Sequence, residues 1–236
     1  MKRCILVVLS LCFICGALFA GDVAVFDDIG FSADGKTYLF GQYGTTDKTF
    51  RGYAEIYAVD IENNSFRTNG IYRTNATEAT AGKSGASVYD ELKKKNTTWL
   101  SSWKASPAEI SEVLYIRPYN SKTSESEIVV RDFEHSTAAN TMQYTFKLVP
   151  FIEGKGASLT SSFYITVEKK DSTGKLLNKI VAGSPDVKRR GISGYNIEKI
   201  VCDKTATKFV IIVEKISEEE NAAPSVRYMV ETFVLK

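Results

Sequence analysis

The sequence predicts a mainly β protein, in which antiparallel β-meanders form blade-like sheets packed as a sandwich or an incomplete propeller, with one appended helix. Three observations support this fold class. Apolar and polar residues alternate over many short runs, as they do in half-buried strands. The turns between these runs suit antiparallel hairpins and are too short for parallel crossovers. Helical spacing of large apolar residues is clearest in one stretch, residues 86–103.

The stretch Ile29–Ile61 predicts a strand, a tight turn, a strand, a loop and a third strand. Asp34-Gly35 supplies the positive φ that a short hairpin needs. Tyr38 and Phe40 then alternate with their neighbours on one face, and the third run repeats this pattern.

A weaker copy of this unit, Ile200–Leu235, closes the chain. Shifts of 171 and then 176 residues bring the two copies into the same inward and outward alternation, which indicates a shared supersecondary unit. The aligned pairs are Phe31 with Cys202, Tyr38 with Phe209, Phe40 with Ile211, Arg51 with Arg227, Glu55 with Glu231, Tyr57 with Phe233, and Val59 with Leu235. Cys202 should therefore point into the core, as Phe31 does.

The segment between the two units begins with a polar stretch, Arg67–Gly85, for which we expect a loop. A helix should follow over Ala86–Trp103, with Asn96 and its two threonines as a point where it breaks. Ser106-Pro107-Ala108-Glu109 carries the signals of a second helix start.

The remainder, from Glu127 onward, is predicted to be nearly all β, with a longer loop marked by Pro185-Asp186 and by residues 191–194. The expected strands are Glu127–Phe133, Met142–Ile152, Ser162–Lys169, Leu176–Ala182, Tyr195–Cys202, Lys208–Ile216 and Val226–Leu235.

The N-terminus predicts export. Lys2 and Arg3 precede an almost wholly apolar run that ends in small residues at Ala20, which is the pattern of a cleaved signal peptide over residues 1–20. A transmembrane anchor and lipid attachment at Cys15 are the alternatives, but the run is short for a bilayer crossing and lacks the small residues usual before a lipidated cysteine. We expect one exported domain, residues 21–236, periplasmic or secreted, with a helical insert at about 86–112 and no integral membrane span after cleavage.

Charge and cysteine content limit the kinds of ligand and the sources of stability that this protein can have. The chain has 30 basic and 28 acidic residues, so loss of Lys2 and Arg3 leaves 28 of each. A neutral protein is not predicted to bind nucleic acid, which calls for a basic excess. Only Cys202 would remain after cleavage, so stability must come from a core and not from an internal disulfide.

The sequence resembles known families in two ways, one carried by the opening unit and one by the whole arrangement. Phe31 to Lys36, followed by Tyr38-Leu39-Phe40 and Glu55 to Asp60, resembles the blade motif of TolB-type β-propeller repeats. The whole arrangement also resembles a family of predicted secreted bacterial proteins of no assigned function, in which a segment like Tyr53–Ile61 precedes a helical insert and a terminal strand pair. A closed propeller takes at least four blades of roughly 40 residues, and this chain has too few residues for that.

Candidate chemistry is sparse. His135, the only histidine, lies in a polar strand end and is expected to be a solvated turn residue. Gly82-Lys83-Ser84 lacks the first glycine of a phosphate loop, because position 77 is threonine. The basic run Lys188-Arg189-Arg190 suits either a solvated loop or contact with anionic lipid or a partner. No cofactor and no metal site is predicted.

The best remaining constellation is Arg51, Glu55, Arg227 and Glu231, since residues four apart on a strand share a face. These residues form either a ligand site between the two units or two structural ion pairs. The leading functional hypothesis is a non-catalytic exported protein that binds another protein or a cell-envelope component. The alternative is a hydrolase whose carboxylates converge between the two units.

Overall fold

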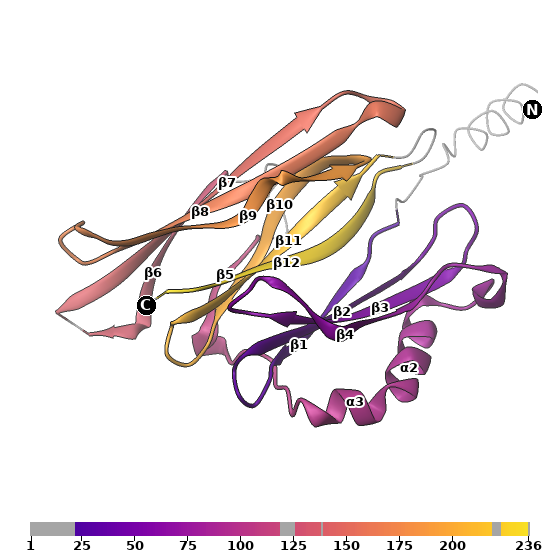
Figure 1. The fold of residues 1–236 in the computed structure, drawn as a ribbon, viewed down its shortest axis with the longest axis horizontal. Coiled ribbons are helices and arrows are strands. Elements are labelled where there is room, and N and C mark those ends of the chain that lie inside the picture. Colours follow the sequence, from indigo (N-terminus) through magenta and orange to yellow (C-terminus); the bar gives the residue numbers. More distant parts are fainter. Residues whose placement is uncertain (1–21, 119–125, 138, 219–222, 236) are drawn as a thin grey trace, which may run out of the picture.

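The computed structural model describes residues 22–118, 126–137, 139–218 and 223–235. It confirms a mainly β fold of three four-stranded antiparallel sheets (Figure 1). The predicted signal peptide, residues 1–20, and Cys15 lie outside the described residues, so cleavage and lipid attachment stay predictions.

The first sheet has the order β1-β2-β3-β4, the second β12-β11-β10-β5 and the third β6-β7-β8-β9. The strands are β1 (Val25–Phe31), β2 (Thr37–Thr45), β3 (Gly52–Asp60), β4 (Ser65–Thr74), β5 (Val113–Ile116), β6 (Glu127–Thr137), β7 (Asn140–Glu153), β8 (Thr160–Lys170), β9 (Leu176–Arg190), β10 (Ile192–Cys202), β11 (Lys208–Ser217) and β12 (Ser225–Val234). Short 3-10 turns occupy Glu78–Thr80, Ile110–Glu112 and Gly156–Ser158.

The second sheet lies between the other two and is covered on both faces. One apolar cluster joins its Phe209 and Ile211 to Phe146 of the third sheet, while another joins its Val210 and Ile212 to Phe40 of the first sheet. Successive residues of a strand point to opposite faces, so a strand covered on both sides needs a continuous apolar run. The run Phe209–Val213 meets that need, because all five of its residues are fully buried.

The first sheet carries the helices on its outer face (Figure 1). The expected single helix is observed as α2 (Gly85–Lys95) and α3 (Thr97–Ser102), separated at Asn96 as its poor helix propensity allows. Ser84 caps α2 by accepting a hydrogen bond from the backbone N–H of Ser87. Trp99 packs on Tyr72 of β4, with ring centroids 4.6 Å apart.

Three local predictions are wrong, for physical reasons. The expected loop after Arg67 is strand β4, an edge strand exposed along most of its length, so it shows no clean alternation. Strand β9 continues through Pro185 to Arg190, which an edge strand permits because its outward N–H groups need no partner. The predicted helix start at Ser106 is absent: Ser106 forms a β-bridge with Phe31, and only the 3-10 turn Ile110–Glu112 follows.

The opening unit, Ile29–Ile61, and its copy, Ile200–Leu235 (together the two framing units), stack in the same orientation. The faces predicted to point inward therefore point in the same direction and do not meet each other. Tyr38 and Phe40 point from the first sheet toward the second, whereas their counterparts Phe209 and Ile211 point from the second toward the third. The alternation predicted by the alignment is therefore observed. The strand register differs by two residues, however: Gln42 pairs with Glu55, but Glu231 pairs with Ile211, the counterpart of Phe40.

Cys202 is fully buried in the cluster between the second and third sheets, as the alignment predicted. Its thiol approaches the Glu112 carbonyl oxygen at 3.6 Å. Burial, with Asp132 and two other carboxylates nearby, raises the pKa of the Cys202 thiol to about 12. The thiolate is the reactive form, so this cysteine is an unreactive core residue.

Candidate functional site

The last strands of the three sheets meet along one side of the molecule and enclose a pocket of about 450 Å³, here called the three-sheet cleft. Its floor is β12, and its walls are the β3–β4 turn with the start of β4 and the second half of β9. The lining residues are Val59, Asn63, Asn64, Ser65, Phe66, Gly183, Ser184, Val187, Arg189, Met229, Val230 and Glu231.

The first sheet seals most of the open edge of β12. The side-chain oxygen of Gln42 accepts the backbone N–H of Tyr228 at 2.8 Å, and that of Asn64 accepts the N–H of Thr232 at 2.8 Å. Asn64 has a φ of +47°, a conformation that asparagine tolerates better than most residues. These amides replace a neighbouring strand and hold the wall of the cleft against its floor.

Glu231 is the most buried charged group in the cleft, with a side chain only 6% exposed. It accepts a hydrogen bond from the Asn64 amide, and Arg189 Nη2 lies 3.8 Å from its Oε1. Gly183, with φ +78°, lets β9 approach closely, since a Cβ there would lie 3.4 Å from Glu231 Cδ. Burial raises the pKa of Glu231, and Asn64 and Arg189 only partly oppose that effect.

We expect Glu231→Gln to be at least as stable as the wild type at pH 7. Because the folded pKa is raised, the unfolded state ionises first as the pH passes about 4.3. The wild type then loses stability relative to Glu231→Gln until the pH exceeds the folded pKa. Urea unfolding of both proteins between pH 4 and pH 8 measures the difference. If the stability of the wild type relative to the variant instead increased as the pH rises, the raised pKa of Glu231 would be contradicted.

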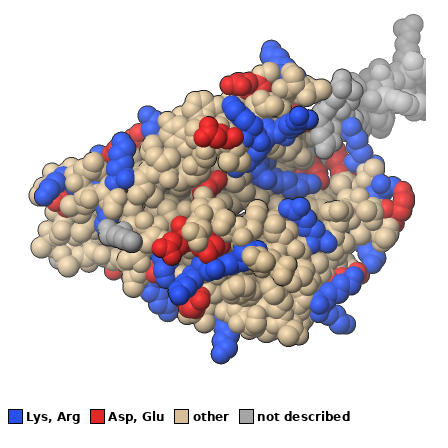
Figure 2. Space-filling view, in the orientation of Figure 1, with Lys and Arg blue, Asp and Glu red and all other residues tan. Residues whose placement is uncertain are grey.

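A group of basic residues adjoins the cleft where β9 ends and β12 begins. Lys215 lies on β11, where its strand partners are Tyr195 on one side and Arg227 on the other. Burial lowers its pKa, and three guanidiniums, those of Arg189, Arg227 and Arg73, lower it further. The Glu55 carboxylate opposes this shift. Figure 2 shows Lys and Arg side chains gathered on the side where β9 and β12 approach the first sheet.

The structure brings three of the four predicted site residues to this region. Glu231 lies in the cleft, and Arg227 is two residues from the lining residue Met229 on the same strand and pairs with Lys215 in the strand register. The Glu55 carboxylate partly opposes the lowering of the Lys215 pKa by burial. Arg51 lies apart and pairs with Glu78. Glu55 accepts hydrogen bonds from Gln42 and Tyr57 at 2.7 and 2.6 Å and pairs with Arg73. A ligand-binding role for the four residues stays a prediction.

Sequence reasoning missed Lys215, Arg73 and Asn64, and it treated Arg189 as part of a loop. A signal existed for Arg189, since alternate residues of a strand point to opposite faces. Lys188 and Arg190 are exposed, whereas the Arg189 side chain is only 20% exposed and turns inward. The sequence also carried a signal for Lys215. Every second residue of a strand lies on the same face, so Lys215 is a charged residue on the face of β11 that Phe209 and Ile211 occupy.

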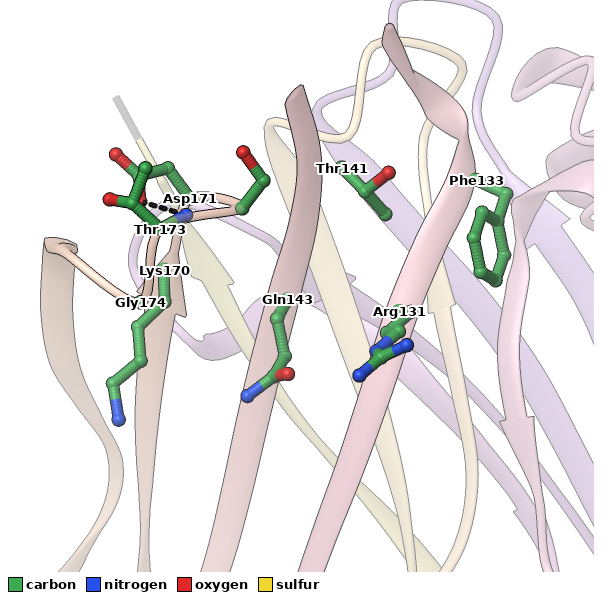
Figure 3. Close-up of a pocket in the computed structure, with 9 residues that line it drawn as sticks. Arg131, Phe133, Thr141, Gln143, Lys170, Asp171, Thr173 and Gly174 are labelled. Carbon is green, nitrogen blue, oxygen red and sulfur yellow. Dashed lines mark hydrogen bonds between the residues drawn. The ribbon is translucent and has the colours of Figure 1, made fainter. Parts of the chain in front are cut away.

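A second pocket, of about 510 Å³, lies on the outer face of the third sheet. Arg131, Gln143 and Lys170 extend from three neighbouring strands in a cross-strand row, and Phe133 lies beside Arg131 (Figure 3). The Asp171 carboxylate at its rim is occupied by hydrogen bonds within its own turn. The charges here are more exposed than Glu231, so this pocket is the weaker candidate.

His135 is not a solvated turn residue. Its Nδ1 lies 3.0 Å from Oδ1 of Asp132, a carboxylate that is almost fully buried and also accepts the His135 backbone N–H. The pair closes an irregularity in β6, and among the described residues no hydroxyl or thiol hydrogen-bonds to the other ring nitrogen. No group of three or more His, Cys, Asp and Glu in the described ranges could hold a metal ion.

The geometry thus defines a three-sheet β protein with a charged cleft along one edge. The chain belongs to the family described as Predicted secreted protein (DUF2259), whose model matches residues 39–233. The exported localisation expected from the sequence agrees with this family. Searches of curated proteins and of solved structures find no match. Within the described part of the chain, no helix has the length and apolar content needed to cross a membrane.

Proposed function

We propose that this protein is a non-catalytic exported protein that binds another protein or a cell-envelope component through the three-sheet cleft. The observation that carries the proposal is a set of charges held at fixed positions around an apolar surface. Phe66, Met229 and Val230 line the cleft beside Glu231 and Arg189. Fixed charges beside an apolar floor suit selective binding, because the floor supplies affinity and the charges fix orientation.

The state of the carboxylates supports binding over catalysis. Glu55 is held by Gln42, Tyr57 and Arg73, and Glu231 by Asn64 and Arg189. A catalytic carboxylate must be free to exchange a proton with substrate or water. Both groups are instead engaged with neighbours in the folded protein.

The hydrolase remains the second candidate, and one observation favours it. The raised pKa of Glu231 is what a general acid in a cleft requires. Such an enzyme would need a second carboxylate about 5 to 9.5 Å away across the substrate. Replacement of Glu231 by Gln would then abolish hydrolysis of an envelope glycan, whereas a binding role leaves no activity to lose.

The test is capture of a partner from envelope extract by the purified mature protein with cross-linking. Val187 lines the cleft and is 51% exposed, whereas Val129 is 54% exposed on the outer face of the third sheet. We expect Val187→Arg to reduce the captured component at least tenfold and the matched Val129→Arg to leave it unchanged. Equal capture by both variants would contradict binding in the cleft.

A further inference from the structure

Three guanidiniums beside the three-sheet cleft share one arrangement. Each lies over an aromatic ring: Arg227 over Tyr53 at 4.0 Å from Cζ to the ring centroid, Arg189 over Phe163 at 5.0 Å, and Arg73 over Tyr57 at 5.4 Å. Stacking on a ring restricts a guanidinium and leaves its N–H groups in fixed directions. These donors are therefore preorganised.

Each of these guanidiniums also has a carboxylate partner. Arg227 pairs with Asp22 at 2.6 Å, Arg73 with Glu55 at 3.3 Å, and Arg189 with Glu231 at 3.8 Å. A guanidinium carries five N–H donors, and one carboxylate accepts two at most in a bidentate pair. Arg227 also donates to the Val226 and Asp22 carbonyl oxygens at 2.8 and 3.2 Å. Arg189 donates to the Val187 carbonyl oxygen at 3.2 Å, and Arg73 to the Tyr57 hydroxyl at 3.3 Å. Among the described residues these contacts still leave N–H donors free on each guanidinium.

Lys215 differs from its neighbours. It is half-buried on β11, where Arg227 and Tyr195 are its partners on the two flanking strands, and the Arg189 Cζ lies over the Tyr195 ring at 6.0 Å from the centroid. None of the described residues forms a hydrogen bond or ion pair with its amine. The three carboxylates match the three guanidiniums in number, so the group that includes Lys215 carries one net positive charge. A half-buried cation without a partner is costly, and an anion that accepts from it would remove that cost.

We propose that Lys215, with Arg189, Arg227 and Arg73, binds a phosphate-type oxyanion, and that this group is the anionic end of the ligand taken by the three-sheet cleft. This inference rests on the proposed function and names its ligand class. An oxyanion with several negative oxygens suits donors carried on the separate strands β4, β9, β11 and β12 better than a single carboxylate does. The adjoining lining of Phe66, Met229 and Val187 suits an apolar substituent on the phosphate.

The test is isothermal titration of the mature protein with inorganic phosphate and with hexyl phosphate, at constant ionic strength in chloride buffer. We expect both to bind, hexyl phosphate more tightly. Lys215→Met should weaken binding of both at least about tenfold, the loss expected for a charged hydrogen bond. Lys147→Met, an exposed lysine on the outer face of the third sheet, should bind within twofold of the wild type.

Two further measurements keep the proposal falsifiable. Lys215→Met should have a Tm at or above that of the wild type without phosphate, because it removes a half-buried charge that has no hydrogen-bond or ion-pair partner among the described residues. If it fails to fold, Arg73→Gln, at a side chain that is 49% exposed, should weaken hexyl phosphate about three- to tenfold. Unchanged phosphate binding in the variant that folds, or no binding to the wild type, would overturn the proposal.

Vesicles separate the sources of such a phosphate. Flotation with phosphatidic acid vesicles, but not with phosphatidylcholine vesicles, would indicate a lipid headgroup, and binding of hexyl phosphate alone would indicate a soluble ester. The outcomes also separate the two proposals. If phosphate does not bind while Val187→Arg still loses its envelope partner, the oxyanion assignment fails and binding in the cleft stands.

Discussion

Replacing either Ile211 or Ile212 by alanine is expected to destabilise the protein by about 2–5 kcal/mol, the usual cost of a large-to-small change in a packed core. The two residues are adjacent on β11 and fully buried, yet they belong to different clusters. Ile211 faces the third sheet and Ile212 faces the first. In a two-layer sandwich one of them would face solvent and its loss would cost little.

Urea or thermal unfolding of the two variants measures this effect. At this chain length each kcal/mol shifts Tm by about 2–4 °C, so both variants should melt well below the wild type. Ile116→Ala is the control, because Ile116 is 62% exposed on β5 of the same sheet and should change stability by less than about 0.5 kcal/mol. A cost below about 1 kcal/mol for one of the two isoleucines would show that one face of the central sheet is open.

Gly30→Ala is expected to lower the free energy of unfolding by about 3 kcal/mol or more, because it combines backbone strain with a steric clash of the added Cβ. Gly30 has a φ of +102° at a bulge in β1, and a Cβ there would lie 1.8 Å from the Ser106 carbonyl oxygen. That carbonyl accepts the N–H of Phe31 at 3.0 Å, and the Phe31 carbonyl oxygen accepts the N–H of Ser106 at 3.1 Å in return. The substitution therefore breaks the contact that ties the segment after α3 to the first sheet.

Gly174→Ala separates the two causes. Gly174 also has a positive φ, +84°, but a Cβ there would meet nothing within 4 Å. Gly174→Ala should therefore lower the free energy of unfolding by only about 1 kcal/mol, the cost of the backbone strain alone. Equal costs for Gly30→Ala and Gly174→Ala would mean that the close approach of Ser106 does not hold the fold together.

The sequence was most informative where large aromatic residues recur at every second position. Tyr38 and Phe40 show this pattern, so their face could be predicted, although β2 is buried on both faces. Strand β4 could not, because it is an edge strand with little buried surface. The order of the three sheets was also hidden, although the uninterrupted apolar run Phe209–Val213 is what a strand covered on both faces requires.

The two-residue register difference between the framing units shows the limit of such alignments. A shift of two residues leaves every side chain on its original face, so alternation alone cannot detect it. The aligned pair Glu55 and Glu231 therefore points in the same sense within each sheet but occupies different positions in the pairing. Lys215 was missed for a related reason, because the residues around it come from three sheets that only folding brings together.

The central claim is that the ligand of this protein lies where the last strands of the three sheets meet. A photo-reactive amino acid placed at Val187 tests it most directly, with the same group at Val129 on the outer face of the third sheet as control. Irradiation in envelope extract should attach an envelope component to the protein labelled at 187 and leave the protein labelled at 129 unmodified. Attachment at 129 and none at 187 would contradict the account.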